Sequence, residues 1–140
     1  MATTTAATFA SSTIMPPSAA IINQANPNRD GTGPMQALGI SGSQLGTRVD
    51  WIRIQALAAT TNGMIRLFMK PWNGAISMFA EIPVAAATPN STTPAFSADY
   101  FPPYNPMLGQ SQIAIPLYWQ ILASTENAEP FAITAFGSNL

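Results

Sequence analysis

Apolar and polar side chains alternate along residues 46–70, on both sides of a small polar turn at Thr60–Gly63. Before the turn, Val49 and Trp51 fall on one face of an extended chain, and Ile52 falls on the other. After the turn, the side chains that alternate between the two faces are Met64, Ile65, Arg66, Leu67, Phe68, Met69 and Lys70. Because successive side chains of a strand point to opposite faces, this pattern predicts a β-hairpin.

Both faces of this predicted hairpin carry apolar groups. An antiparallel hairpin with one face in water would instead alternate between apolar and polar residues. The second face of the hairpin must therefore also be covered, either by another sheet of the same chain or by another chain.

Further short apolar runs follow, separated by turns rich in Pro, Gly and Asn. They predict strands over residues 19–24, 35–40, 75–84, 95–101, 117–124 and 130–136. Asn73-Gly74 is the pair preferred in a tight type I′ turn, and Pro83 indicates an edge position or a bulge because it lacks an N–H for the ladder. Many short strands without sustained helical spacing predict an all-β protein, an antiparallel β-sandwich with a jelly-roll-like arrangement.

Residues 1–18 differ in composition from the rest, because they are mostly Thr, Ala and Ser. Such a segment buries too little apolar surface to offset its own ordering entropy. We expect a flexible N-terminal arm over 1–18 and a single β-sandwich domain over 19–140. The arm either stays disordered or becomes ordered on a neighbouring subunit.

The chain is poor in charge. Of its 140 residues, 8% are charged and 47% are hydrophobic, and the net charge is −1; ordinary soluble domains have about 25% charged residues. Since charge is depleted at the cores of protein interfaces, this composition favours a subunit that contacts neighbours over an isolated, charge-poor domain. The charge gives no electrostatic footprint for nucleic acid, and no apolar run approaches the ~20 residues that span a membrane.

Candidate chemistry is sparse, because the sequence contains neither Cys nor His. Disulfides, thiolate metal sites and the commonest general base are therefore excluded, and a Ser or Thr nucleophile would need a rarer base such as Lys70. Glu126 and Glu129 offer oxygen ligands of the kind that bind Ca²⁺, although two carboxylates in a polar loop are more often solvated. We expect no enzymatic activity, no cofactor and no metal.

Charged residues on the predicted hairpin form a second group. Arg48 and Asp50 share one face of the first strand, and cross-strand pairing with Arg66 would neutralise them locally. The alternative is that these charges take part in an intersubunit contact.

Aromatic residues follow in the second half of the chain. The side chains that permit a carbohydrate-stacking surface are Trp72, Tyr100, Phe101, Tyr104, Tyr118 and Trp119, although most such residues belong to cores or interfaces. The Pro-rich segment Phe101–Gly109 predicts an exposed loop of fixed shape. The subunit contacts predicted in the arm and in this loop are Met15, Pro16, Pro17, Phe101, Tyr104 and Met107.

Four segments occur in a characteristic order and spacing: a Gly-Thr-Arg-hydrophobic-acid start, an Arg-Leu-Phe strand, a Glu-Ile-Pro-Val segment and a closing pattern that begins Ala-Ser-Thr and ends Ala-aromatic-Gly. They lie at Gly46–Asp50, Arg66–Phe68, Glu81–Val84 and Ala123–Gly137. Together they resemble small structural proteins of tailed bacteriophages. The resemblance covers about two thirds of the chain, roughly residues 45–138.

This resemblance implies a non-enzymatic virion protein with a β-sandwich fold. The best fit is a capsid decoration (cement) protein, which binds the phage major capsid protein on the head surface, often as a homotrimer. Such a protein is made in the bacterial cytoplasm, is located on the virion, and binds neither nucleic acid nor membrane. The alternative is a tail or head-fibre module that recognises a host surface polysaccharide.

Overall fold

The computed structural model describes residues 18–38, 46–106 and 110–139. The predictions made for Met15, Pro16, Pro17 and Met107 lie outside the described residues. The described part of the chain contains eleven strands and no helix. The strands are β1 (Ser18–Ile22), β2 (Gln36–Ala37), β3 (Thr47–Ala56), β4 (Gly63–Lys70), β5 (Ser77–Val84), β6 (Ser97–Tyr100), β7 (Tyr104–Asn105), β8 (Gln110–Ser111), β9 (Ile113–Ile115), β10 (Gln120–Thr125) and β11 (Phe131–Asn139).

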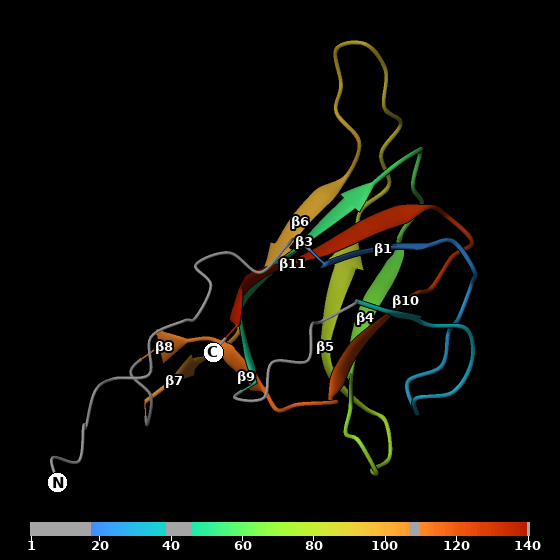
Figure 1. The fold of residues 1–140 in the computed structure, drawn as a ribbon. Coiled ribbons are helices and arrows are strands. Elements are labelled where there is room, and N and C mark those ends of the chain that lie inside the picture. The colour runs from blue at the N-terminus through green and yellow to red at the C-terminus, as the bar shows by residue number, and fades with distance from the viewer. Residues whose placement is uncertain (1–17, 39–45, 107–109, 140) are drawn as a thin grey trace, which may run out of the picture.

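Two antiparallel sheets pack face to face (Figure 1). The first sheet has the order β1-β11-β3-β6, and β9 also pairs with β3. The second sheet has the order β2-β10-β4-β5, while β7 and β8 form a small separate ladder. The predicted all-β antiparallel sandwich is confirmed.

The strand partners define a jelly-roll path. β4 pairs with β5, β3 with β6, β2 with β10 and β1 with β11. The two halves of the chain therefore pair like the arms of one long hairpin whose tip is the β4–β5 turn. This hairpin is rolled up, so that consecutive strands of each arm fall in opposite sheets.

The predicted hairpin over 46–70 is wrong in its pairing, although both of its strands are present. β3 belongs to the first sheet and β4 to the second, and residues 57–62 cross between them. Thr60 anchors this crossing, because its backbone exchanges hydrogen bonds of 2.9 and 3.1 Å with Ala87. Alternation with a period of two residues predicts a strand but does not identify the strand that pairs with it. Here β3 and β4 are consecutive strands in the same half of the rolled-up long hairpin. The predicted pairing of Arg66 with the charges of β3 is wrong for the same reason.

A β-bulge also changes which side chains of β3 face the interior. Trp51 pairs with Phe136, and the next ladder pair is Val49 with Gly137, so Asp50 is an extra residue. An extra residue shifts the phase of alternation by one. Val49 therefore shares the inner face with the later buried residues of β3, while Trp51 lies on the outer face, contrary to the simple alternation.

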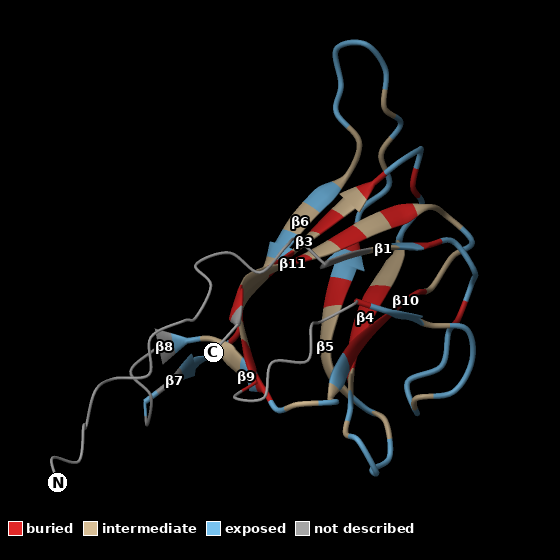
Figure 2. Cartoon of the chain, in the orientation of Figure 1, coloured by how far each residue is buried: buried red, intermediate tan, exposed pale blue. Residues whose placement is uncertain are grey.

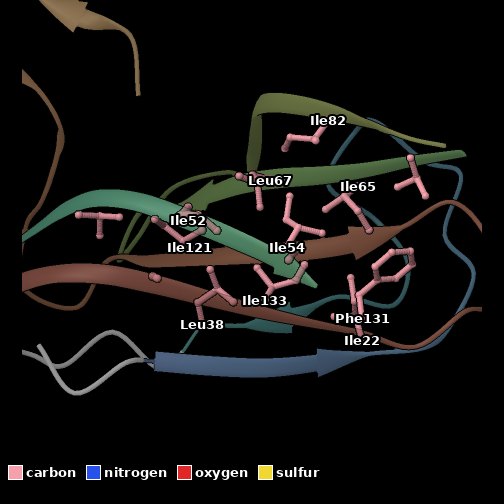
Figure 3. Packing of buried hydrophobic residues seen from close by; sticks show 14 of the residues in the cluster. Ile22, Leu38, Ile52, Ile54, Ile65, Leu67, Ile82, Ile121, Phe131 and Ile133 are labelled. Atoms are coloured by element: carbon pink, nitrogen blue, oxygen red, sulfur yellow. The ribbon is translucent and has the colours of Figure 1, made fainter. Parts of the chain in front are cut away.

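The interior between the sheets is rich in isoleucine (Figures 2 and 3). Ile52 and Ile54 of the first sheet and Ile65 and Leu67 of the second are each 0% exposed. Burial of each such side chain contributes roughly 1.5–3 kcal/mol relative to its exposed state. Figure 3 shows these side chains between the sheets, together with Ile133 of β11.

Of the two predictions made for the β4–β5 region, the edge position of β5 is confirmed and the type I′ turn is wrong. β5 is an edge strand, as Pro83 indicated, and it pairs with β4 alone. Neither Asn73 nor Gly74 has a positive φ, so the turn is not type I′. Gly74 is required here for close packing, because a Cβ at this position would lie 2.9 Å from the ring of Pro71.

Candidate interaction surface

The outer face of the second sheet is covered by residues 23–35 of the same chain. The backbone N–H of Asn26 donates to the carbonyl of Thr125 on β10 at 2.8 Å. At the other edge of the sheet, Arg29 forms an ion pair with Glu81 on β5. The segment therefore crosses β10, β4 and β5 from the outside.

Beneath this segment lies Arg66 of β4, which is 1% exposed. Phe68, two residues further along β4, is 0% exposed. Nη1 of Arg66 donates to the carbonyl of Asn26 at 3.2 Å, Nη2 lies 2.5 Å from Glu126, and Nε lies 3.3 Å from Glu81. Every nitrogen of the guanidinium is engaged, so Arg66 ties the covering segment to three parts of the sheet. This is a structural role, because the group is 1% exposed and each of its three nitrogens already faces a partner within the protein.

The two carboxylates considered as calcium ligands do not converge. Glu126 contacts Arg66, whereas Glu129 accepts hydrogen bonds from the backbone N–H and the hydroxyl of Thr61 at 2.8 and 2.5 Å. Across the described ranges, no group of three acidic side chains is placed to hold a metal ion.

The Arg29–Glu81–Arg66 arrangement makes stability depend on pH. The hydrogen bond from Arg29, and then that from Arg66, lowers the pKa of the Glu81 carboxyl below its ordinary value. A carboxyl whose folded pKa is lowered stabilises the fold fully above the unfolded pKa, and loses that contribution as pH falls through the folded pKa.

We expect Glu81→Gln to flatten the acid side of the stability profile. The urea midpoint of the parent protein should fall as pH drops below about 4, the ordinary range of a Glu carboxyl. In E81Q the fall should be shallower, and the remainder should come partly from Asp30, whose pKa is lowered by the Thr32 hydroxyl. Urea titrations from neutral to acidic pH measure this, and parallel profiles for the two proteins would contradict it.

The outer face of the first sheet carries a row of three aromatic rings. Trp51 of β3 and Phe136 of β11 are directly opposite each other and stack with centroids 4.3 Å apart and planes 11° apart. Phe101, just after β6, continues the row at 6.2 Å from Trp51 and is 64% exposed. Trp51 and Phe136 are half-buried and stand outside the interior cluster. The rings thus form an apolar ridge across three strands.

The charges beside this row neutralise one another. Arg48 pairs with Asp50 at 2.9 Å, and Arg53 pairs with Asp99 on β6 at 3.2 Å. All four side chains are between 34% and 42% exposed. Arg48 and Asp50 therefore pair with each other within β3, and not across strands with Arg66 as predicted. Exposed pairs of this kind contribute little to stability, about 0–1 kcal/mol.

Two further exposed apolar residues lie on β1 and β7. Ile21 of edge strand β1 is 61% exposed, and Tyr104 of β7 is 64% exposed. The segment predicted as a loop from Phe101 contains β7, which pairs with β8. Phe101 and Tyr104 are exposed as predicted, whereas Tyr100 packs against the interior.

Trp51 and Phe136 were not among the contact residues predicted from the sequence. Simple alternation placed Trp51 on the same face as Val49, which is buried. Gly137 could have indicated the bulge from the sequence, because an isolated glycine in a strand indicates a bulge or a close backbone approach. A Cβ at Gly137 would lie 1.8 Å from the carbonyl oxygen of Arg48.

A scan against protein-family models, a search of curated proteins and a search of solved structures each found no match to this chain. In the described part of the chain, no helix has the length and apolar character needed to cross a bilayer. Function is therefore inferred from this chain's own residues.

Proposed function

We propose that this protein is a non-catalytic structural subunit that binds its neighbours through the outer face of the first sheet. The aromatic row of Trp51, Phe136 and Phe101 carries this proposal. Clustered aromatics with depleted net charge are typical of the centre of a protein interface. Burying this face removes apolar rings from water and leaves no unpaired charge behind, because the neighbouring ion pairs are internal.

The contrast between the two sheets supports the choice of face. The second sheet is closed on its outer side over Arg66 by residues 23–35, and Arg66 is 1% exposed. The first sheet keeps Phe101 and Ile21 more than half exposed. A partner chain on the first sheet would supply there the cover that residues 23–35 supply on the second.

The particular assembly we propose is a bacteriophage head. The protein would act as a capsid decoration protein that reinforces the shell by contacts with the major capsid protein and with copies of itself, as a homotrimer. The order of the Gly-Thr-Arg, Arg-Leu-Phe and Glu-Ile-Pro-Val segments supports this assignment. The jelly-roll path is compatible with it, since viral capsid domains use this fold, but lectin domains use it too.

Substitution of Phe101 tests the proposed face. Because Phe101 is 64% exposed, Phe101→Ser should leave the fold intact and weaken self-association at least tenfold, as measured by sedimentation equilibrium of the full chain. Thr134→Glu adds a second carboxylate on the same face opposite Arg53, which already pairs with Asp99, and this net negative charge should have a similar effect. Trp72→Ser is the matched control, because Trp72 is 66% exposed and follows β4 of the second sheet.

A chain that stays monomeric at all concentrations, or three variants that associate equally, would contradict this face as the contact. The virion assignment has its own test. Particles of a phage that lacks this gene should lose heat resistance and recover it when the purified protein is added. Particles that never contain the protein would contradict that assignment.

A further inference from the structure

Two aromatic side chains are exposed to solvent at one end of the sandwich. Trp72 lies in the β4–β5 turn and Tyr118 in the turn before β10, in the lower part of Figure 1. They are 66% and 65% exposed, with ring centroids 5.8 Å apart and planes tilted by 37°. Pairing of Lys70 with Gln120 at the ends of β4 and β10 brings the two turns together.

Tyr118 occupies a backbone conformation that disfavours its residue type. Its φ is +68°, and it is the one non-glycine residue with positive φ in the described part of the chain. The N–H of Trp119 donates to the carbonyl of Pro116 at 3.2 Å, which places Tyr118 at the turn position usually taken by Gly or Asn. A side chain there costs roughly 1–2 kcal/mol.

The fold gains little from the Tyr118 side chain in return. The ring is mostly in water and its aromatic partner, Trp72, is equally exposed. Backbone strain that packing does not offset is characteristic of functional positions. In this backbone conformation the Tyr118 ring lies beside that of Trp72.

Three polar residues are close to Trp72 and Tyr118 along the two strands and turns. Asn73 follows Trp72 in the turn, and Gln120 and Lys70 form the adjacent cross-strand pair. All three are exposed. Their amide and ammonium groups supply donors and acceptors at the rim of an apolar platform.

We propose that Trp72 and Tyr118 bind a pyranose ring of a neutral oligosaccharide. The apolar C–H face of the sugar would pack on the two rings, and its hydroxyls would reach the amides of Asn73 and Gln120. Tyr and Trp suit this use because each combines a large apolar face with a polar group. A protein partner fits less well, since two rings on turns fall far short of the ~800 Å² per partner of a stable interface. This inference is independent of the proposed function, because the site lies on turns of the second sheet.

The test is a fluorescence titration of the full chain with maltohexaose, cellohexaose and chitohexaose. We expect saturable quenching or a blue shift with at least one of them, with a Kd on the order of 0.1–1 mM. Trp72→Ala and Tyr118→Ser should each weaken that binding at least tenfold, with binding to the Trp72→Ala variant measured by isothermal titration calorimetry because this variant lacks the reporting indole. Tyr104→Ser is the matched control, because Tyr104 is as exposed but lies on β7.

Tyr118→Gly separates binding from folding. Glycine accepts the positive φ without strain, so the variant should fold with unchanged or higher stability and still lose the sugar. Three results would overturn the proposal: no saturable binding to any of the three hexasaccharides, equal binding by the Trp72→Ala variant, or a loss of self-association in that variant without any sugar binding.

Discussion

Replacing Arg66 with alanine should lower the free energy of unfolding by about 3 kcal/mol, which is typical of breaking a buried ion pair by removing one partner. The guanidinium is 1% exposed and holds Glu81, Glu126 and the carbonyl of Asn26. Its removal leaves Glu126 and the Asn26 carbonyl without this donor and leaves Glu81 with Arg29 alone, and it opens a space beneath residues 23–35. Urea unfolding at neutral pH measures the loss.

Arg53→Ala is the matched control for this experiment. Arg53 also pairs with a carboxylate, Asp99, but the two side chains are 42% and 34% exposed. Its loss should therefore stay within about 1 kcal/mol. Equal losses in the two variants would show that Arg66 does not hold the covering segment.

A double variant tests the physical cause. Arg66→Met keeps the apolar stem but leaves Glu126 unpaired, while Glu81 keeps Arg29 as its partner, so the variant should be nearly as unstable as R66A. Adding Glu126→Gln removes the unpaired charge and should restore much of the lost stability. Failure to recover would mean that packing of the side chain, rather than charge pairing, accounts for the effect.

Replacing Gly137 with alanine should destabilise the fold by about 2–3 kcal/mol, at the upper end of the usual cost of overpacking. The new Cβ would lie 1.8 Å from the carbonyl oxygen of Arg48 and 2.9 Å from the Cα of Val49. Both atoms belong to the backbone of β3, so no side-chain rotation relieves the clash. β3 and β11 must separate at the bulge, beside the stacked pair of Trp51 and Phe136.

Gly63→Ala provides the comparison for G137A. Gly63 also lies in a strand, but its Cβ would meet the side-chain amide of Asn127 at 2.6 Å, which is the end of a flexible side chain. We expect a cost of about 1 kcal/mol or less. Near-ultraviolet circular dichroism of Trp51 should change in G137A and not in G63A. A Gly137 variant as stable as the parent would contradict the close approach of the two strands.

The sequence by itself determined where most strands run and that they form an antiparallel sandwich. Alternation in β3, β4 and β5 is a local property, because backbone geometry sends successive side chains to opposite faces. Pro83 marked an edge strand for an equally local reason, the missing N–H. The exposure of Phe101 and Tyr104 also followed from their Pro-rich surroundings.

Only the tertiary structure decided which strands are neighbours and which faces stay open. β3 and β4 are close in sequence but lie in opposite sheets, because rolling the long hairpin buries the inner faces of both. The bulge at Asp50 put Val49 and Trp51 on opposite faces, and the segment 23–35 closed over Arg66. These outcomes depend on contacts between residues distant in the chain, and the period of a single strand contains no information about them.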